Sequence, residues 1–163
     1  MQKNLSKAVE DIAKYKSSMQ QQLLDFSQTD MLFFFSEKEE LYKLQKQYWM
    51  PIIEWAEKLL GMKLTISNSL SVPSNEGLTE ALEKQIKLLN DKEFCCWYAA
   101  ALNMRSVLLG LALIKNKCSA KDAAYLSALE ELWQNEQWGE DEEAKEARTI
   151  KEKELFEIEA FNQ

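Results

Sequence analysis

Apolar residues recur every three or four positions along most of the chain, which is the spacing that gathers them on one face of an α-helix. The first such stretch runs from Leu5 to about Phe26 and includes Ala8, Val9 and Ile12 on its apolar face. Thr29 and Asp30 follow, two residue types that commonly end or begin helices. The pattern therefore predicts an amphipathic helix that ends just before this pair.

A second helical pattern surrounds a proline. Ser36 and Glu39 have the spacing of a helix-capping pair, and apolar positions then continue to Gly61, a residue type that often terminates helices. Pro51 lies inside this stretch, between Trp49 and the residues that lead to Gly61. Because proline lacks a backbone donor and crowds the preceding turn, we expect a kink there, or a second helix that starts at Pro51.

The remaining chain alternates between helical patterns and short breaks. A polar connector follows Gly61 and includes "SNSLSVPSNEG", which is too short to form a sheet by itself. Further helices are expected over about 75–89, from Asp91 to near 115, from Ser119 to a break at Gly139, and from 140 to the end. The sequence thus predicts an all-α fold. We expect a compact bundle of five to six helices, with one Pro-kinked or broken helix and a short extended connector, in a single domain over residues 1–163.

The amino-acid composition narrows the class of protein to which the chain can belong. With 46% apolar and 29% charged residues, the 163-residue chain is typical of globular domains with a real core. The longest apolar stretch, Cys95 to Ile114, is interrupted by Arg105, so we interpret it as a buried core helix and expect no membrane insertion. A formal charge of −7 would repel nucleic acids and anionic lipids, which argues against either as the main partner.

The chain contains no histidine, and this removes most common catalytic sites. Histidine-based nucleophile activation and histidine-containing zinc or di-iron sites are excluded. The three cysteines form no CxxC pair and are expected to be reduced, core-like thiols. Carboxylate clusters such as Glu140 to Glu143 fit solvated helix starts better than metal sites. We therefore predict a non-enzyme without cofactor, metal or small-molecule substrate; an enzymatic alternative would require bound iron or manganese.

Two longer stretches carry a family resemblance. "TDMLFFFSEKEELYKLQKQYWMPIIEWAEKLLG" (29–61) and "SALEELWQNEQWGEDEEA" (127–144) resemble the ATP12 chaperone family, which assembles the catalytic head of F-type ATP synthase by binding its α subunit. The segments "RSVLLGLAL" and "CSAKDAAYLSALEE" between them also look like this family. The resemblance covers nearly everything after about residue 29.

The resemblance implies a non-enzymatic chaperone that holds the free α subunit until it joins β and so prevents its aggregation. It also implies that residues 1–163 correspond to the family's helical C-terminal domain, with the usual β-rich N-terminal domain absent. The compartment would be the bacterial cytoplasm, or the mitochondrial matrix in a eukaryote. The alternative is a stand-alone helical adaptor or regulator that kept the scaffold and lost the chaperone task.

Partner contact is expected where tryptophans and carboxylates lie beside helix breaks. The resemblance implies that an acidic residue three positions after the glycine of the Trp-Gly pair is important, and Glu142 occupies that position after Gly139. An alternative is that Glu142 only stabilises the start of the last helix. The expected partner-binding residues are Glu142, Trp138, Gly139, Glu130, Gln134 and Trp49.

Overall fold

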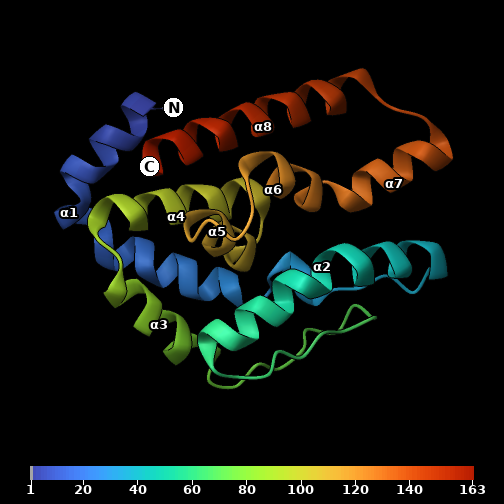
Figure 1. Cartoon of the computed structure of the whole chain (residues 1–163), viewed down its shortest axis with the longest axis horizontal. Coiled ribbons are helices and arrows are strands. Elements are labelled where there is room, and N and C mark those ends of the chain that lie inside the picture. The colour runs from blue at the N-terminus through green and yellow to red at the C-terminus, as the bar shows by residue number, and fades with distance from the viewer. Residues whose placement is uncertain (1) are drawn as a thin grey trace.

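The structure is a computed structural model that describes residues 2–163, and its architecture is helical (Figure 1). Within these residues there are eight α-helices and one short 3₁₀ turn, so the all-α prediction is confirmed and the expected number of five to six helices is wrong. The elements are α1 (Gln2–Ser27), η1 (Met31–Phe33), α2 (Glu39–Leu60), α3 (Leu78–Leu88), α4 (Asp91–Met104), α5 (Val107–Ile114), α6 (Ala120–Ser127), α7 (Leu129–Trp138) and α8 (Glu142–Asn162).

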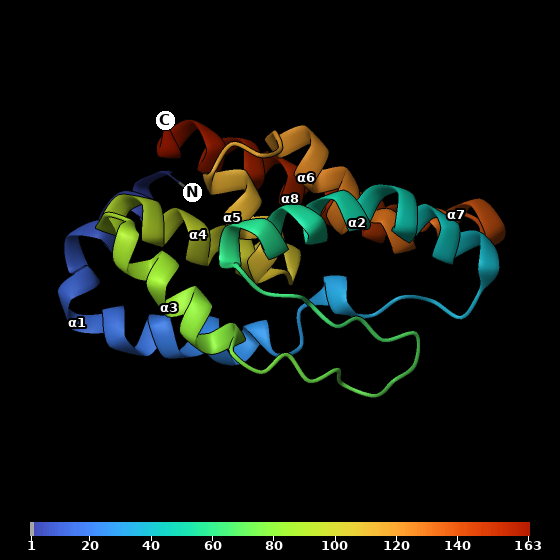
Figure 2. The same ribbon diagram turned by 60° about the horizontal axis from the view of Figure 1, so that its bottom comes forward.

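The short helix α5 lies at the centre of the bundle, and all eight of its residues are buried. Helix α4 packs along α5, while α8 crosses over α4 and α6, as Figure 1 shows. The start of α2 and the helix α7 reach the same end of the molecule, where they lie side by side in Figure 2. None of the described helices combines the length and the apolar character needed to cross a membrane.

The helix expected from Asp91 to about residue 115 is in fact two helices, α4 and α5. Arg105 ends α4 in the left-handed region, with a φ of 57°, and Ser106 caps α5 by accepting a hydrogen bond from the Leu109 amide. Asn90 caps α4 in place of the predicted Asp91, through a reciprocal pair with Glu93. The apolar pattern concealed the break, because both helices are buried in the same core.

The break between α4 and α5 is held by the buried carboxylate of Asp30. One carboxylate oxygen accepts hydrogen bonds from the Leu32 amide at 2.9 Å and the Ser106 hydroxyl at 2.7 Å, and the other accepts from the Leu108 amide at 3.0 Å. Burial raises the pKa of Asp30, while these donated bonds act to lower it by stabilising the charged form. Asp30 thus ties the end of α1 to the start of the central helix.

The helix expected from Ser119 to Gly139 is also divided, at Ala128. Ser119 caps α6 and Gly139 follows α7, as predicted, but a backbone turn at Ala128 separates the two helices. Next to this turn the indole of Trp49 donates a 2.9 Å hydrogen bond to the carbonyl of Leu126. A continuous helix uses that carbonyl for the amide four residues later, so the contact with α2 favours the division.

Helix α2 runs without interruption through Pro51, and the predicted second helix at this residue does not exist. Pro51 lies on the exposed face, where water can satisfy the carbonyl of Gln47 that loses its helical donor. The predicted Ser36 cap is wrong as well: Lys38 is the N-cap, and the Ser36 hydroxyl accepts from the Lys38 amide. Gly61 ends the helix in the left-handed conformation, as expected.

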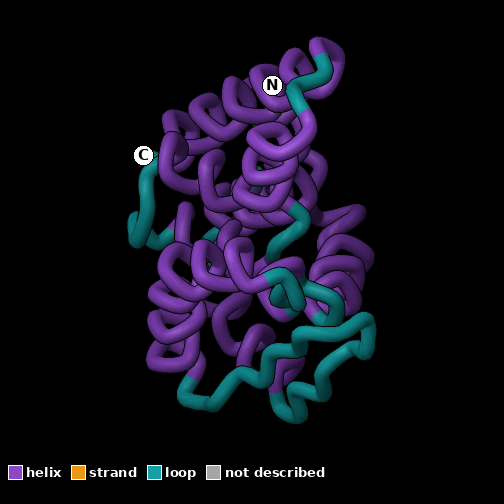
Figure 3. Tube along the Cα trace, turned by 90° about the vertical axis from the view of Figure 1, so that its right-hand side faces the viewer, coloured by secondary structure: helices purple, strands orange, loops and turns teal. Residues whose placement is uncertain are grey.

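The connector after α2 is extended, as predicted. Its Ser67 exchanges backbone hydrogen bonds of 2.7 Å with Phe33 and Phe35. Figure 3 shows the two loop segments beside each other along one edge of the helices. This single bridge is the extent of strand pairing among residues 2–163.

Candidate functional site: the α7–α8 corner

The chain reverses direction between α7 and α8 through Gly139, Glu140 and Asp141, a segment that we call the corner together with Trp138 and Glu142. Gly139 adopts a φ of 91°, which L side chains rarely allow, and a side chain there would otherwise meet open space. Asp141 caps α8 by accepting a hydrogen bond from the Ala144 amide. Gly139 thus allows the chain to reverse direction, and Asp141 fixes the start of α8.

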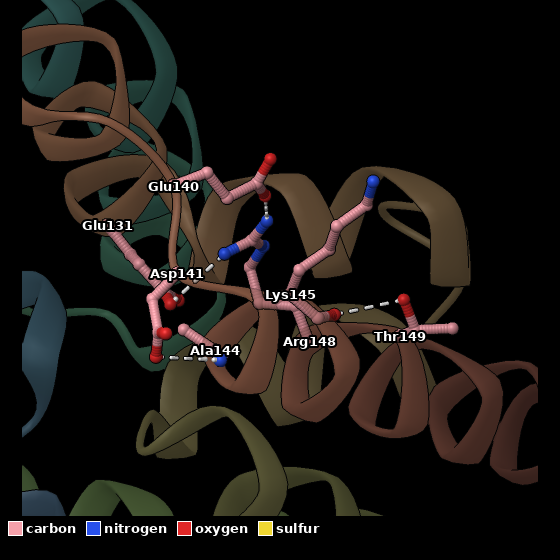
Figure 4. A network of polar contacts seen from close by, with 7 residues as sticks. All are labelled: Glu131, Glu140, Asp141, Ala144, Lys145, Arg148 and Thr149. Atoms are coloured by element: carbon pink, nitrogen blue, oxygen red, sulfur yellow. Dashed lines mark hydrogen bonds and ion pairs between the residues drawn. The ribbon is translucent and has the colours of Figure 1, made fainter.

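Arg148 of α8 links the corner to α7, as Figure 4 shows. Its guanidinium lies between two carboxylates, donating to Glu131 of α7 at 3.1 Å and to Glu140 of the corner. Burial acts to lower the pKa of Arg148, but the bonds to Glu140 and Glu131 outweigh it, so the pKa is raised. The side chain is only 17% exposed, and the two bonds join α7, the corner and α8 into one unit.

Two tryptophans form the aromatic side of the corner. The rings of Trp133 and Trp138 meet edge to face with centroids 6.1 Å apart. Trp133 is buried against the bundle, whereas Trp138 is 69% exposed. An exposed indole held by a buried one is a rigid apolar contact surface, because its position costs little further ordering when a partner binds.

Glu142 is the first residue of α8 and is exposed. Asp141 already provides the side-chain cap, so stabilisation by Glu142 at this helix start reduces to its interaction with the helix dipole. Among the described residues no hydrogen bond or ion pair involves the Glu142 side chain. Its carboxylate is therefore accessible to a partner.

The structure brings together only part of the predicted set of residues. Trp138, Gly139 and Glu142 share the corner, while Glu130 and Gln134 lie on α7 and line a pocket of about 620 Å³ between α6, α7 and α8. Trp49 is fully buried and bonded to Leu126, so it belongs to the core and not to this surface. Its place beside a proline suggested exposure, but the helix continues through Pro51 and keeps the ring inside.

Sequence reasoning missed Arg148, Glu131 and Lys38 at this site. Arg148 pairs with carboxylates 17 and 8 positions away, a separation that follows only from the reversal of the chain at the corner. The strong negative charge was visible: residues 129–146 contain eight carboxylates and one lysine. This segment, which contains the corner, therefore has a net charge of −7 and is strongly acidic.

Known proteins are similar to this chain in sequence and in fold. The sequence model of the ATP12 chaperone protein family matches residues 1–57. The crystal structure of Atp12 from Paracoccus denitrificans superposes with a TM-score of 0.91 at 26% identity, covering 98% of this chain and 70% of that one. The chain is thus similar to the ATP12 chaperone family in the sequence of residues 1–57 and in its fold.

Two further proteins are similar to this chain over most of its length. The mitochondrial protein atp12 of Schizosaccharomyces pombe is 25% identical over 154 residues, which cover 87% of this chain and 53% of that protein. A mutant of the Paracoccus denitrificans protein matches with a TM-score of 0.91 at 26% identity, over 97% of this chain and 69% of its own. The chain thus spans about half the length of the curated relative that it matches.

Proposed function

We propose that this chain is an assembly chaperone of F-type ATP synthase that binds the free α subunit and prevents its aggregation before it joins β. Similarity to the ATP12 chaperone family, in sequence and in fold, is the observation that carries the proposal. The subunits of such a ring expose large apolar interfaces while they are unassembled, and masking one of them transiently requires binding without a chemical step.

The corner is the surface that we assign to this task. Trp138 offers an exposed aromatic anchor, and interface anchors are enriched in tryptophan. Glu142 lies in the same corner with no hydrogen bond or ion pair found among the described residues, and the carboxylates near it in sequence favour a basic surface on the bound subunit. Gly139 provides the reversal that places both at one end of the molecule, and Glu130 and Gln134 extend the surface along α7.

A pull-down with separately produced α and β subunits tests the proposal. We expect the immobilised chain to retain free α and to leave free β in solution. Equal retention of both subunits, or no retention of α, would contradict it. Failure to retain either subunit would favour the alternative of a helical adaptor.

A further inference from the structure

A lysine of the chain already occupies the aromatic side of the corner. The Lys38 ammonium lies 4.9 Å from the ring centroid of Trp138 and 5.4 Å from that of Trp133, within the range of cation–π attraction. Lys38 is the N-cap of α2, and its amide is fixed by the Ser36 hydroxyl. The two elements meet at the same end of the molecule, where α2 and α7 are neighbours (Figure 2).

Neither the helix dipole nor an ion pair among the described residues accounts for this position of the ammonium. The first turn of a helix carries partial positive charge and disfavours a cation. The ion pairs found among the described residues do not involve Lys38, although Glu37 and Glu39 adjoin it in sequence. The two indole rings are the direct contacts of this cation among the described residues.

We propose that the Trp138 ring is a binding site for an arginine side chain of the bound partner, and that Lys38 occupies this site in the free chain. We call this site the seat. Trp138 lies within the acidic segment 129–146, so a cationic group is attracted to it before contact. Arginine fits better than lysine, because its planar guanidinium stacks on an indole and is more weakly hydrated. Lys38 then competes with the partner and lowers its affinity.

The assignment of the partner as the α subunit rests on the proposed function, but the seat can be tested without that subunit. An acetylated, amidated tetra-arginine peptide is titrated into ¹⁵N-labelled protein, and the indole resonance of Trp138 is followed by NMR. This resonance is identified by its absence in Trp138→Leu. A citrulline tetrapeptide, which keeps the shape and removes the charge, is the ligand control.

Lys38→Met keeps the apolar stem and removes the cation, and we expect it to bind the arginine peptide about two- to fivefold more tightly than the wild type. Lys43→Met is the matched control: it removes the same charge from the exposed face of the same helix, where Lys43 pairs with Glu39. The ε-methylene protons of Lys38, shifted by the rings in the free chain, should move toward their solvent values as the peptide binds.

Equal gains in affinity for Lys38→Met and Lys43→Met would reduce the effect to net charge and overturn the proposal. An unchanged Trp138 resonance, or peptide binding by Trp138→Leu as tight as that of the wild type, would overturn it too. If the peptide binds as expected while free α is not retained in the pull-down, the seat stands and the proposed function is wrong. If free α is retained but the arginine peptide does not bind, the proposed function stands and the seat is contradicted.

Discussion

The Ser106 hydroxyl donates a 2.7 Å hydrogen bond to the buried carboxylate of Asp30, across 76 positions of the chain. Ser106 also accepts from the Leu109 amide, so its own proton is directed at Asp30. Every group that we find against this carboxylate is a donor, which is the environment of an ionised acid. The pair joins the first helix of the bundle to the break before its central helix.

Asp30→Asn should therefore lower the free energy of unfolding by about 2–4 kcal/mol, because the amide turns a donor toward groups that are already donors. Ser106→Ala removes one donor only and should cost about 1 kcal/mol. Chemical denaturation measures both changes. Asp25→Asn, an exposed change of the same kind on α1, is the control. Equal stability of the two asparagine variants would show that the carboxylate is dispensable.

Gly110→Ala should destabilise the protein by about 1–3 kcal/mol through overpacking. A Cβ atom at this position would lie 3.0 Å from the backbone nitrogen of Ala101 and 3.1 Å from the Trp97 ring, where α4 and α5 approach closely. Helix propensity alone predicts the opposite sign, since alanine is favoured over glycine by about 1 kcal/mol. Ala147→Gly on the exposed face of α8 calibrates that propensity, and a more stable Gly110→Ala variant would refute the packing argument.

Pro51→Ala should preserve the fold and raise the free energy of unfolding by about 1 kcal/mol or more. The helix already continues through this exposed position, and alanine restores the amide that donates to Gln47. Thermal unfolding and far-ultraviolet circular dichroism measure the change, with Glu54→Ala on the same face as the control. Loss of folded protein would mean that the bend imposed by proline is required for packing.

Glu142→Lys should weaken binding of the α subunit at least tenfold and change the melting temperature little, because a reversed charge at a desolvated contact faces a like charge. Glu143→Lys is a close control: it has the same charge change in the same first turn, and hence the same effect on the helix dipole. Binding is measured by isothermal titration calorimetry or surface plasmon resonance. Equal losses for the two variants would assign the effect to helix stability or general charge.

The thiols of the native protein should react slowly with iodoacetamide near pH 7.5. Burial raises the pKa of Cys96 to about 12, and burial with the nearby Asp122 and Glu159 carboxylates raises that of Cys118 to about 11. Few thiolates are then present at neutral pH, and the thiolate is the reactive form. Mass spectrometry follows alkylation, and the same protein in denaturant provides the unhindered rate. Native labelling at that rate would contradict the raised pKa values.

Local chemistry determined much of this protein before any tertiary contact is considered. The spacing of apolar residues determined the helical class and the extents of α1 and α2, and Ser119, Gly61 and Gly139 marked helix ends correctly. These features depend on residues within about four positions of one another, which is the range of helical side-chain contacts and caps. The concentration of negative charge in residues 129–146 is likewise readable from order alone.

Only the tertiary structure decided where the buried apolar helices break and which side chains meet. Asp30 divides α4 from α5 by taking the amide of Leu108, and Trp49 contacts the carbonyl of Leu126 beside the turn between α6 and α7. The packing of α2, α7 and α8 also decides two contacts of the corner. Lys38 contacts the Trp138 ring, and Arg148 donates hydrogen bonds to Glu131 and Glu140. Such contacts join residues far apart in sequence, and they form because a buried polar group must find a partner wherever the folded chain supplies one.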